Sequence, residues 1–94
     1  MVLPIKKKWF DMIATGVKKE EYREISKYYT IRFENVFKNK ETAEIKLRNG
    51  YSRKSRTLIC RCSIKTGVGK EQWGAVKNKK YYILTIHNII KQNF

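Results

Sequence analysis

The sequence predicts a small α+β domain in which about four to six short strands curl into a barrel beside two helices. The chain has 94 residues, which is the length of a single domain, residues 1–94, with one modest core. Apolar residues show helical spacing in two segments of the N-terminal half, and other segments alternate apolar and polar residues between turn signals. A barrel is favoured because closure leaves no exposed sheet edge.

The first strand is expected at Val2–Ile5, where Pro4 confines it to a sheet edge or a barrel rim. A helix is expected from Lys6 to Thr15, because its apolar residues fall on one side. Gly16 ends this helix, since a left-handed residue after a helix is least costly as glycine. The apolar side of the helix carries Trp9, Phe10 and Ile13.

Residues 17–25 are charged, yet they alternate as a strand does, with successive side chains on opposite faces. The two expected faces carry Lys19, Glu21 and Arg23 on one side and Lys18, Glu20, Tyr22 and Glu24 on the other. Ser26 can then cap a second helix from Lys27 to Asn35.

The rest of the chain is expected to be mainly strand. The segment 43–48 alternates apolar with charged residues and ends at the turn signal Asn49-Gly50. The later elements are expected, in order, to be a basic loop at 51–56, a strand at 57–65, a turn at 66–70, a loop or short helical turn at 72–74, a turn at 78–80 and a last strand at 81–90.

Cys60 and Cys62 are the only cysteines. Residues two apart in a strand point the same way, so both thiols share a face with Leu58 and Ile64. This pattern favours two small buried hydrophobes. A zinc site would need two further ligands, and His87 is the only histidine, so no metal is expected.

Charge is the strongest compositional signal. The chain has 22 Lys and Arg against eight Asp and Glu, a formal net charge of +14. Such an excess favours a polyanionic partner, above all RNA or another nucleic acid, because each neutralised phosphate releases counterions. The alternatives are a device for solubility and an anionic membrane surface. The membrane alternative is weaker because the basic residues are spread along the chain and form no amphipathic anchor.

The chain contains no apolar run near the ~18 residues that a membrane span needs. Its N-terminus places three lysines after a very short apolar stretch, the reverse of a secretory signal. We therefore expect a cytoplasmic, soluble protein, a monomer with neither cofactor nor membrane partner.

The segment Gly16-Val17-Lys18-Lys19-Glu20-Glu21-Tyr22-Arg23 resembles the signature of the ASCH family of PUA-like domains, which is an amphipathic helix followed by G-x-K-x-x-E-x-R. Other segments are similar to parts of compact members of the family: Pro4–Ile13, Arg48–Tyr51, Gln72–Ala75 and the closing strand. The likeness covers nearly the whole chain. It implies a PUA-like barrel of about five or six strands, with the signature residues lining a cleft beside the first helix, and it implies binding of RNA or modified nucleosides.

The charged residues of the signature suit a nucleotide. Lys18 can meet a phosphate or a base carbonyl, Arg23 offers a planar fork, and Glu21 can accept from a base amino group. The alternative is an ion pair between Glu21 and Arg23 that holds the barrel mouth. The full set of expected contacts is Lys6, Trp9, Lys18, Glu21, Arg23, Asn49, Tyr51, Arg53, Lys54, Arg56 and Trp73.

The aromatic residues leave alternatives open. Trp9 is either a core residue or a surface on which a base stacks, and Trp73 is either a lip of the cleft or a plug beneath a loop. Tyr51, beside a run of basic residues, is expected to stack on a base while the cations bind the backbone. The alternative is an ordinary hairpin with a solvated basic tip. Lys77, Lys79 and Lys80 are expected to be solvated or to face phosphates, and His87 to be structural.

The resemblance also includes hydrolases, among them ribonucleases and an amidohydrolase acting on N4-acetylcytidine. That amidohydrolase branch has Thr three residues after the signature Lys, where this chain has Glu21. If the protein is an enzyme, Lys18 and Glu21 are the expected catalytic residues. A binding domain is the favoured interpretation, and a metal-free hydrolase of RNA or of a modified nucleoside is the alternative.

Overall fold

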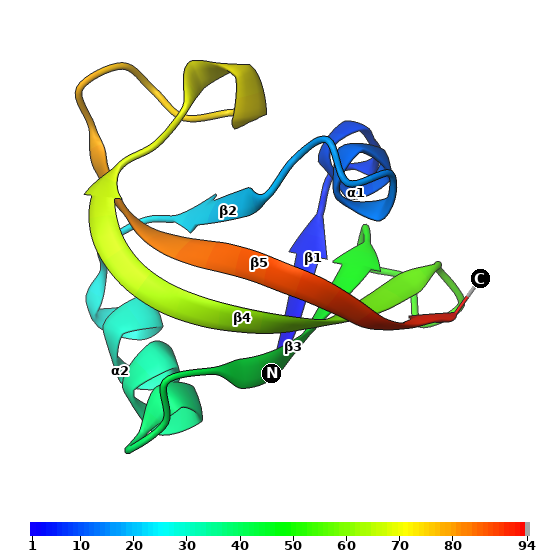
Figure 1. Ribbon diagram of the computed structural model, residues 1–94, viewed down its shortest axis with the longest axis horizontal. Coiled ribbons are helices and arrows are strands. Elements are labelled where there is room, and N and C mark those ends of the chain that lie inside the picture. The colour runs from blue at the N-terminus through cyan, green and yellow to red at the C-terminus, as the bar shows by residue number, and fades with distance from the viewer. Residues whose placement is uncertain (94) are drawn as a thin grey trace.

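The computed structural model describes residues 1–93 and confirms an α+β domain, with two α-helices and a five-stranded mixed sheet (Figure 1). Neither helix within this range combines the length and the apolar character needed to cross a bilayer. The elements are, in chain order, β1 (Val2–Ile5), α1 (Lys7–Ala14), β2 (Glu20–Arg23), α2 (Lys27–Phe37), β3 (Ala43–Asn49), β4 (Thr57–Val68), the 3-10 helix η1 (Glu71–Trp73) and β5 (Lys80–Asn93).

The helix ends follow local chemistry. Gly16 has φ +82°, and its N–H donates to the carbonyl of Ile13 at 3.0 Å, which closes α1 as predicted. The hydroxyl of Ser26 accepts from the N–H of Tyr29 at 3.2 Å and caps α2. Helix α2 continues to Phe37, two residues beyond the predicted end, because the side chain of Phe37 is buried in the core.

The strand order is β1-β3-β4-β5-β2, and only β1 and β3 run parallel. Strands β4 and β5 form a long curved hairpin that pairs from Thr57–Asn93 to Val68–Lys80 (Figure 1). This pairing carries both strands beyond their predicted ends and replaces the first part of the turn expected at 66–70. The core lies on the inner face of the sheet, under both helices: Leu3, Ile5, Phe10, Ile13, Phe33, Phe37, Ala43, Ile45, Leu47, Leu58, Cys60, Cys62 and Leu84.

The sheet is open in the hydrogen-bonded order of its strands. β1 and β2 stand at the two ends, and no backbone ladder within residues 1–93 joins them. The closed barrel therefore remains a prediction. A side chain spans the gap instead, because Nη2 of Arg23 in β2 donates to the carbonyl of Pro4 in β1 at 3.0 Å.

The strand predicted at 17–25 is shorter in the structure, and the predicted division of its side chains between two faces was wrong for Lys18. β2 contains only residues 20–23, since the N–H groups of Val17 and Lys18 both donate to the carbonyl of Met12, at 2.9 and 3.0 Å. The chain therefore turns before the strand begins. As a result Lys18 lies on the same side as Glu21, where strict alternation had placed it on the opposite face.

Both cysteines are free and buried, as the alternation of β4 predicted. Burial raises the pKa of Cys60 to about 11 and that of Cys62 to about 12, from an ordinary value of 9.0. Because the folded pKa values are raised, the unfolded chain loses its thiol protons first. Stability is therefore kept below pH 9 and falls as the pH rises toward these folded values.

We expect the free energy of unfolding to fall by roughly 2–4 kcal/mol between about pH 9 and about pH 10.5, at ~1.4 kcal/mol per pKa unit. Urea unfolding in the presence of a thiol reductant measures this loss. The double variant Cys60→Ala/Cys62→Ala is the control, because it keeps every other titrating group and should show a flatter profile. Equal slopes for the two proteins would contradict the prediction.

Candidate functional site

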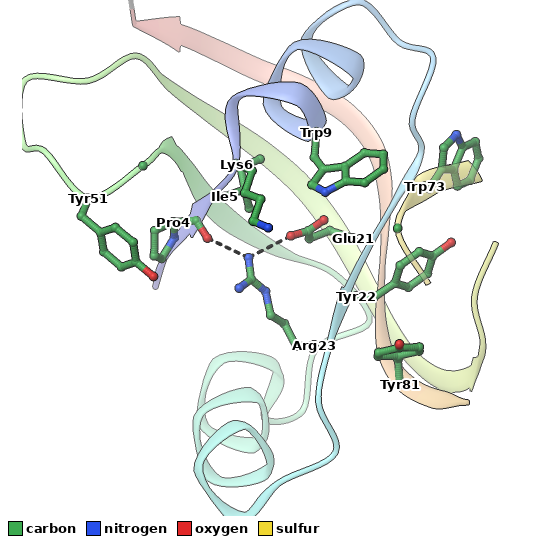
Figure 2. Close-up of a pocket in the computed structure, with 12 residues that line it drawn as sticks. Pro4, Ile5, Lys6, Trp9, Glu21, Tyr22, Arg23, Tyr51, Trp73 and Tyr81 are labelled. Carbon is green, nitrogen blue, oxygen red and sulfur yellow. Dashed lines mark hydrogen bonds and ion pairs between the residues drawn. The ribbon is translucent and has the colours of Figure 1, made fainter. Parts of the chain in front are cut away.

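A cavity of about 360 Å³ opens where β2 and β1 face each other beside α1. Six of the residues predicted as ligand contacts line it: Lys6, Trp9, Glu21, Arg23, Tyr51 and Trp73. In Figure 2, Glu21 lies near the centre with Trp9 above it and Arg23 below it. Tyr51 lies on the left, and Trp73, Tyr22 and Tyr81 lie on the right. The structure thus brings together side chains from α1, β2, η1 and the turn after β3.

Glu21 forms the floor of the cavity with two cations. Its Oε1 lies 3.2 Å from Nζ of Lys18, and its Oε2 lies 2.8 Å from Nη2 of Arg23. The side chain of Glu21 is 9% exposed. The ion pair that the sequence offered as an alternative is therefore present, and the Arg23 partner also lines the cavity. Each carboxylate oxygen keeps a lone pair for one further hydrogen bond.

Lys18 lies beneath the cavity, away from its lining. Its side chain is 1% exposed, and its ammonium donates to the backbone carbonyl of Trp73 as well as pairing with Glu21. The rings of Trp9 and Tyr22 lie 4.9 and 5.0 Å from Nζ. Loss of hydration on burial lowers the pKa of Lys18, against the attraction of Glu21. Lys18 therefore joins the start of β2 to η1 and supports the floor.

Arg23 retains unused donor capacity. Its Nη2 binds Glu21 and the carbonyl of Pro4, at 2.8 and 3.0 Å. Its Nε is buried and has no hydrogen-bond partner among the described residues. A buried donor without an acceptor costs about 1–3 kcal/mol, so a bound acceptor here would be stabilising.

The ring of Trp9 forms a wall of the cavity. A Cβ placed on Gly74, whose φ is +102°, would come within 3.0 Å of Cζ2 of Trp9. Only glycine suits this position, and the close backbone fixes the ring. In Figure 2 the indole nitrogen of Trp9 is turned toward Glu21. Trp73 combines its two predicted alternatives, because it is buried and also lines the cavity. Tyr51, at the rim, is 88% exposed.

Sequence reasoning missed two lining tyrosines, Tyr22 and Tyr81. The hydroxyl of Tyr22 accepts from the N–H of Lys70 at 2.9 Å, and that of Tyr81 accepts from the N–H of Val76 at 2.9 Å. The two rings thereby hold the η1 segment over the end of the sheet. The further lining residues are Pro4, Ile5, Gly50 and Gly74. Tyr22 lies within the signature segment, which was the one available signal.

Five predicted contacts do not line the cavity: Lys18, which lies beneath it, and Asn49, Arg53, Lys54 and Arg56. Arg56 instead pairs with Asp11 at 2.6 Å and lies over the ring of Phe10. Arg53 and Lys54 are exposed on the loop that follows Tyr51. Away from the cavity, Lys79 pairs with Glu24, and Nε2 of His87 lies 2.8 Å from the hydroxyl of Ser63.

The fold and the cavity define a small α+β domain with an open mixed sheet and an aromatic pocket that has a charged floor. No protein-family model, curated protein or solved structure matches the chain. Residues 1–93 contain no group of three or more His, Cys, Asp or Glu side chains that could hold a metal ion.

Proposed function

We propose that this protein binds single-stranded nucleic acid, with RNA as the expected partner, and holds one unstacked nucleotide in the pocket. The observation that carries the proposal is the buried Glu21–Arg23 pair at the floor of a pocket walled by aromatic rings, within a chain of net charge +14. Its volume of about 360 Å³ lies at the small end of the ~300–1,000 Å³ typical of small-ligand pockets.

The floor suits the edge of a nucleobase. The free lone pairs of Glu21 can accept from an amino or imino group, and the unpartnered Nε of Arg23 can donate to a neighbouring carbonyl or ring nitrogen. Every base places a donor next to an acceptor on one of its edges. The rings of Trp9 and Tyr51 supply the apolar faces on which an unstacked base can lie.

The cations supply affinity that is independent of sequence. Seven Lys and Arg side chains form ion pairs among the described residues, out of 22 in the chain. Most of the positive charge therefore remains available to phosphates, which position a nucleic acid without specifying its bases.

The resemblance to the ASCH family supports the same function and a finer fold. In a PUA-like barrel the two ends of the sheet approach each other, and here the hydrogen bond from Arg23 to Pro4 joins those ends. On this proposal Arg23 has two roles, to span the gap and to present its remaining donors to the ligand.

The alternative function is a metal-free hydrolase in which Lys18 and Glu21 act on RNA or on a modified nucleoside. The contacts of these residues favour binding over catalysis. The ammonium of Lys18 is enclosed by Glu21, the carbonyl of Trp73 and two rings, and Lys18 does not line the cavity, so the ammonium does not face a substrate there. A general base must reach the proton that it removes.

The test is fluorescence anisotropy with single-stranded RNA, double-stranded RNA and single-stranded DNA at two salt concentrations. We expect the tightest binding to single-stranded RNA, with log K falling against log[salt] by about 0.7 per phosphate contacted. A denaturing gel run afterwards should show intact RNA. Absent or salt-independent binding would contradict the nucleic-acid proposal. An RNA cleavage product that forms with the wild-type protein and not with Lys18→Ala would establish the hydrolase.

A further inference from the structure

The outer face of the sheet, which is the side opposite the core, carries cations on neighbouring strands. The register places Lys46 of β3, Ile59 of β4 and Lys91 of β5 in one row. Arg48 lies two residues further along β3, on the same face. Lys46 and Arg48 are half-buried, and Lys91 is exposed. The acid on this face of β3, Glu44, is already paired with Arg61 at 3.3 Å.

Arg48 links this face to the pocket. It stands in register with Pro4 of β1, and Pro4 lines the cavity. The Nε of Arg48 is buried without a hydrogen-bond partner among residues 1–93. The Nε of Arg23, at the pocket floor, is likewise buried without such a partner. A phosphate oxygen is the acceptor that an arginine fork binds best.

The opposite side of the pocket is less suited to a polyanion. Glu20 begins β2, Glu24 directly follows it, and Glu71 begins η1. Two of these carboxylates pair with lysines there, Glu20 with Lys65 and Glu24 with Lys79. That surface is therefore mixed in charge, whereas the row on β3 and β5 carries a single sign. A nucleic-acid strand that leaves the pocket across Pro4 therefore meets less repulsion from carboxylates than one that leaves across β2.

We infer that the nucleic-acid strand leaves the pocket across Pro4 and continues over the outer face, where Arg48, Lys46 and Lys91 bind its phosphates. This inference rests on the proposed function and adds a path to it. Lys46 and Lys91 flank Ile59 without an acid between them, and a phosphate over that row relieves their mutual repulsion. The outer face thus extends the site from one nucleotide to several.

The test compares two ligands on matched double variants. The ligands are a nucleoside monophosphate, which fills only the pocket, and a single-stranded RNA of roughly 12 nucleotides, within the span of known single-strand sites. The outer-face variant is Lys46→Gln/Lys91→Gln. Its control is Lys27→Gln/Lys38→Gln, which removes the same charge from exposed positions at the two ends of α2.

For the outer-face variant we expect affinity for the long RNA to fall about tenfold and the salt slope to drop by about 1.4, which corresponds to two phosphates. The control should change affinity by less than about twofold. Monophosphate binding, followed by the NMR signal of the Trp9 indole N–H, should be the same in all three proteins. An equal loss of affinity for the long RNA in the two double variants would contradict the inferred path of the nucleic acid. Weaker monophosphate binding in the outer-face variant would also contradict it.

Failure of the path is distinguishable from failure of the proposed function. If wild-type protein binds the long RNA and the outer-face variant binds it equally well, the path alone is wrong. If wild-type protein binds neither RNA nor monophosphate but binds anionic phospholipid vesicles, the proposed function fails and the path fails with it.

Discussion

The variant Lys18→Met is expected to lower the free energy of unfolding by about 3 kcal/mol, the lower end of the cost of breaking a buried ion pair. Methionine fills a similar volume without charge. It leaves the carbonyl of Trp73 without its donor and leaves Glu21 with Arg23 alone. Urea unfolding measures the loss. Weaker ligand binding should accompany it, because Lys18 joins β2 to η1 beneath the pocket.

Lys19→Met is the matched control, since Lys19 is the next residue and is exposed. It should change stability by less than about 0.5 kcal/mol. The pH dependence gives a second signature. Because burial lowers the folded pKa of Lys18, the unfolded chain holds this proton more tightly than the folded protein does, and stability rises as the pH rises from the folded pKa toward 10.5. The stability of Lys18→Met should not show this rise with pH. A variant as stable as Lys19→Met would contradict the supporting role of Lys18.

The variant Tyr51→Ala is expected to weaken binding of single-stranded RNA about tenfold to a hundredfold, since stacking of a base on an aromatic ring contributes ~1–3 kcal/mol. Tyr51 lies at the rim of the pocket and is 88% exposed. Its removal should therefore leave the free energy of unfolding within about 0.5 kcal/mol of wild type. Anisotropy titration and urea unfolding of the same preparation separate the two effects.

Tyr28→Ala supplies the control, because Tyr28 is an exposed tyrosine of α2 that does not line the pocket. It should bind RNA as wild type does. Tyr51→Phe keeps the ring and should keep most of the affinity. If Tyr51→Ala binds RNA as tightly as Tyr28→Ala, the base does not stack on Tyr51.

Local signals predicted most of the secondary structure. The cap at Ser26, the glycine after α1 and the turn at Asn49-Gly50 each depend on a few adjacent residues, and each is found where the sequence placed it. Strand limits were less accurate. β4 and β5 extend to Val68 and Asn93 because each satisfies the other's backbone, and a partner strand is invisible in a local pattern.

The candidate site was predicted in part. Side chains on the helix, the signature strand and the loop came together at the pocket, including Trp9, Glu21 and Tyr51. The loop cations were harder to place. Arg56 was expected at the ligand, yet it pairs with Asp11, which lies 45 residues before it in the chain. Tyr81 was not expected at the site because its neighbours arrive only through the pairing of β5 with β2.

By itself, the sequence determined the α+β class, the buried thiols of β4 and the strong positive charge, because each follows from composition or from the spacing of near neighbours. Only the tertiary structure decided that the sheet ends at β1 and β2 without a backbone ladder between them, and that Lys18 lies beneath Glu21. Both depend on contacts between distant segments, such as Arg23 with Pro4 and Lys18 with Trp73. Such contacts form only when the whole chain has folded, so no local pattern records them.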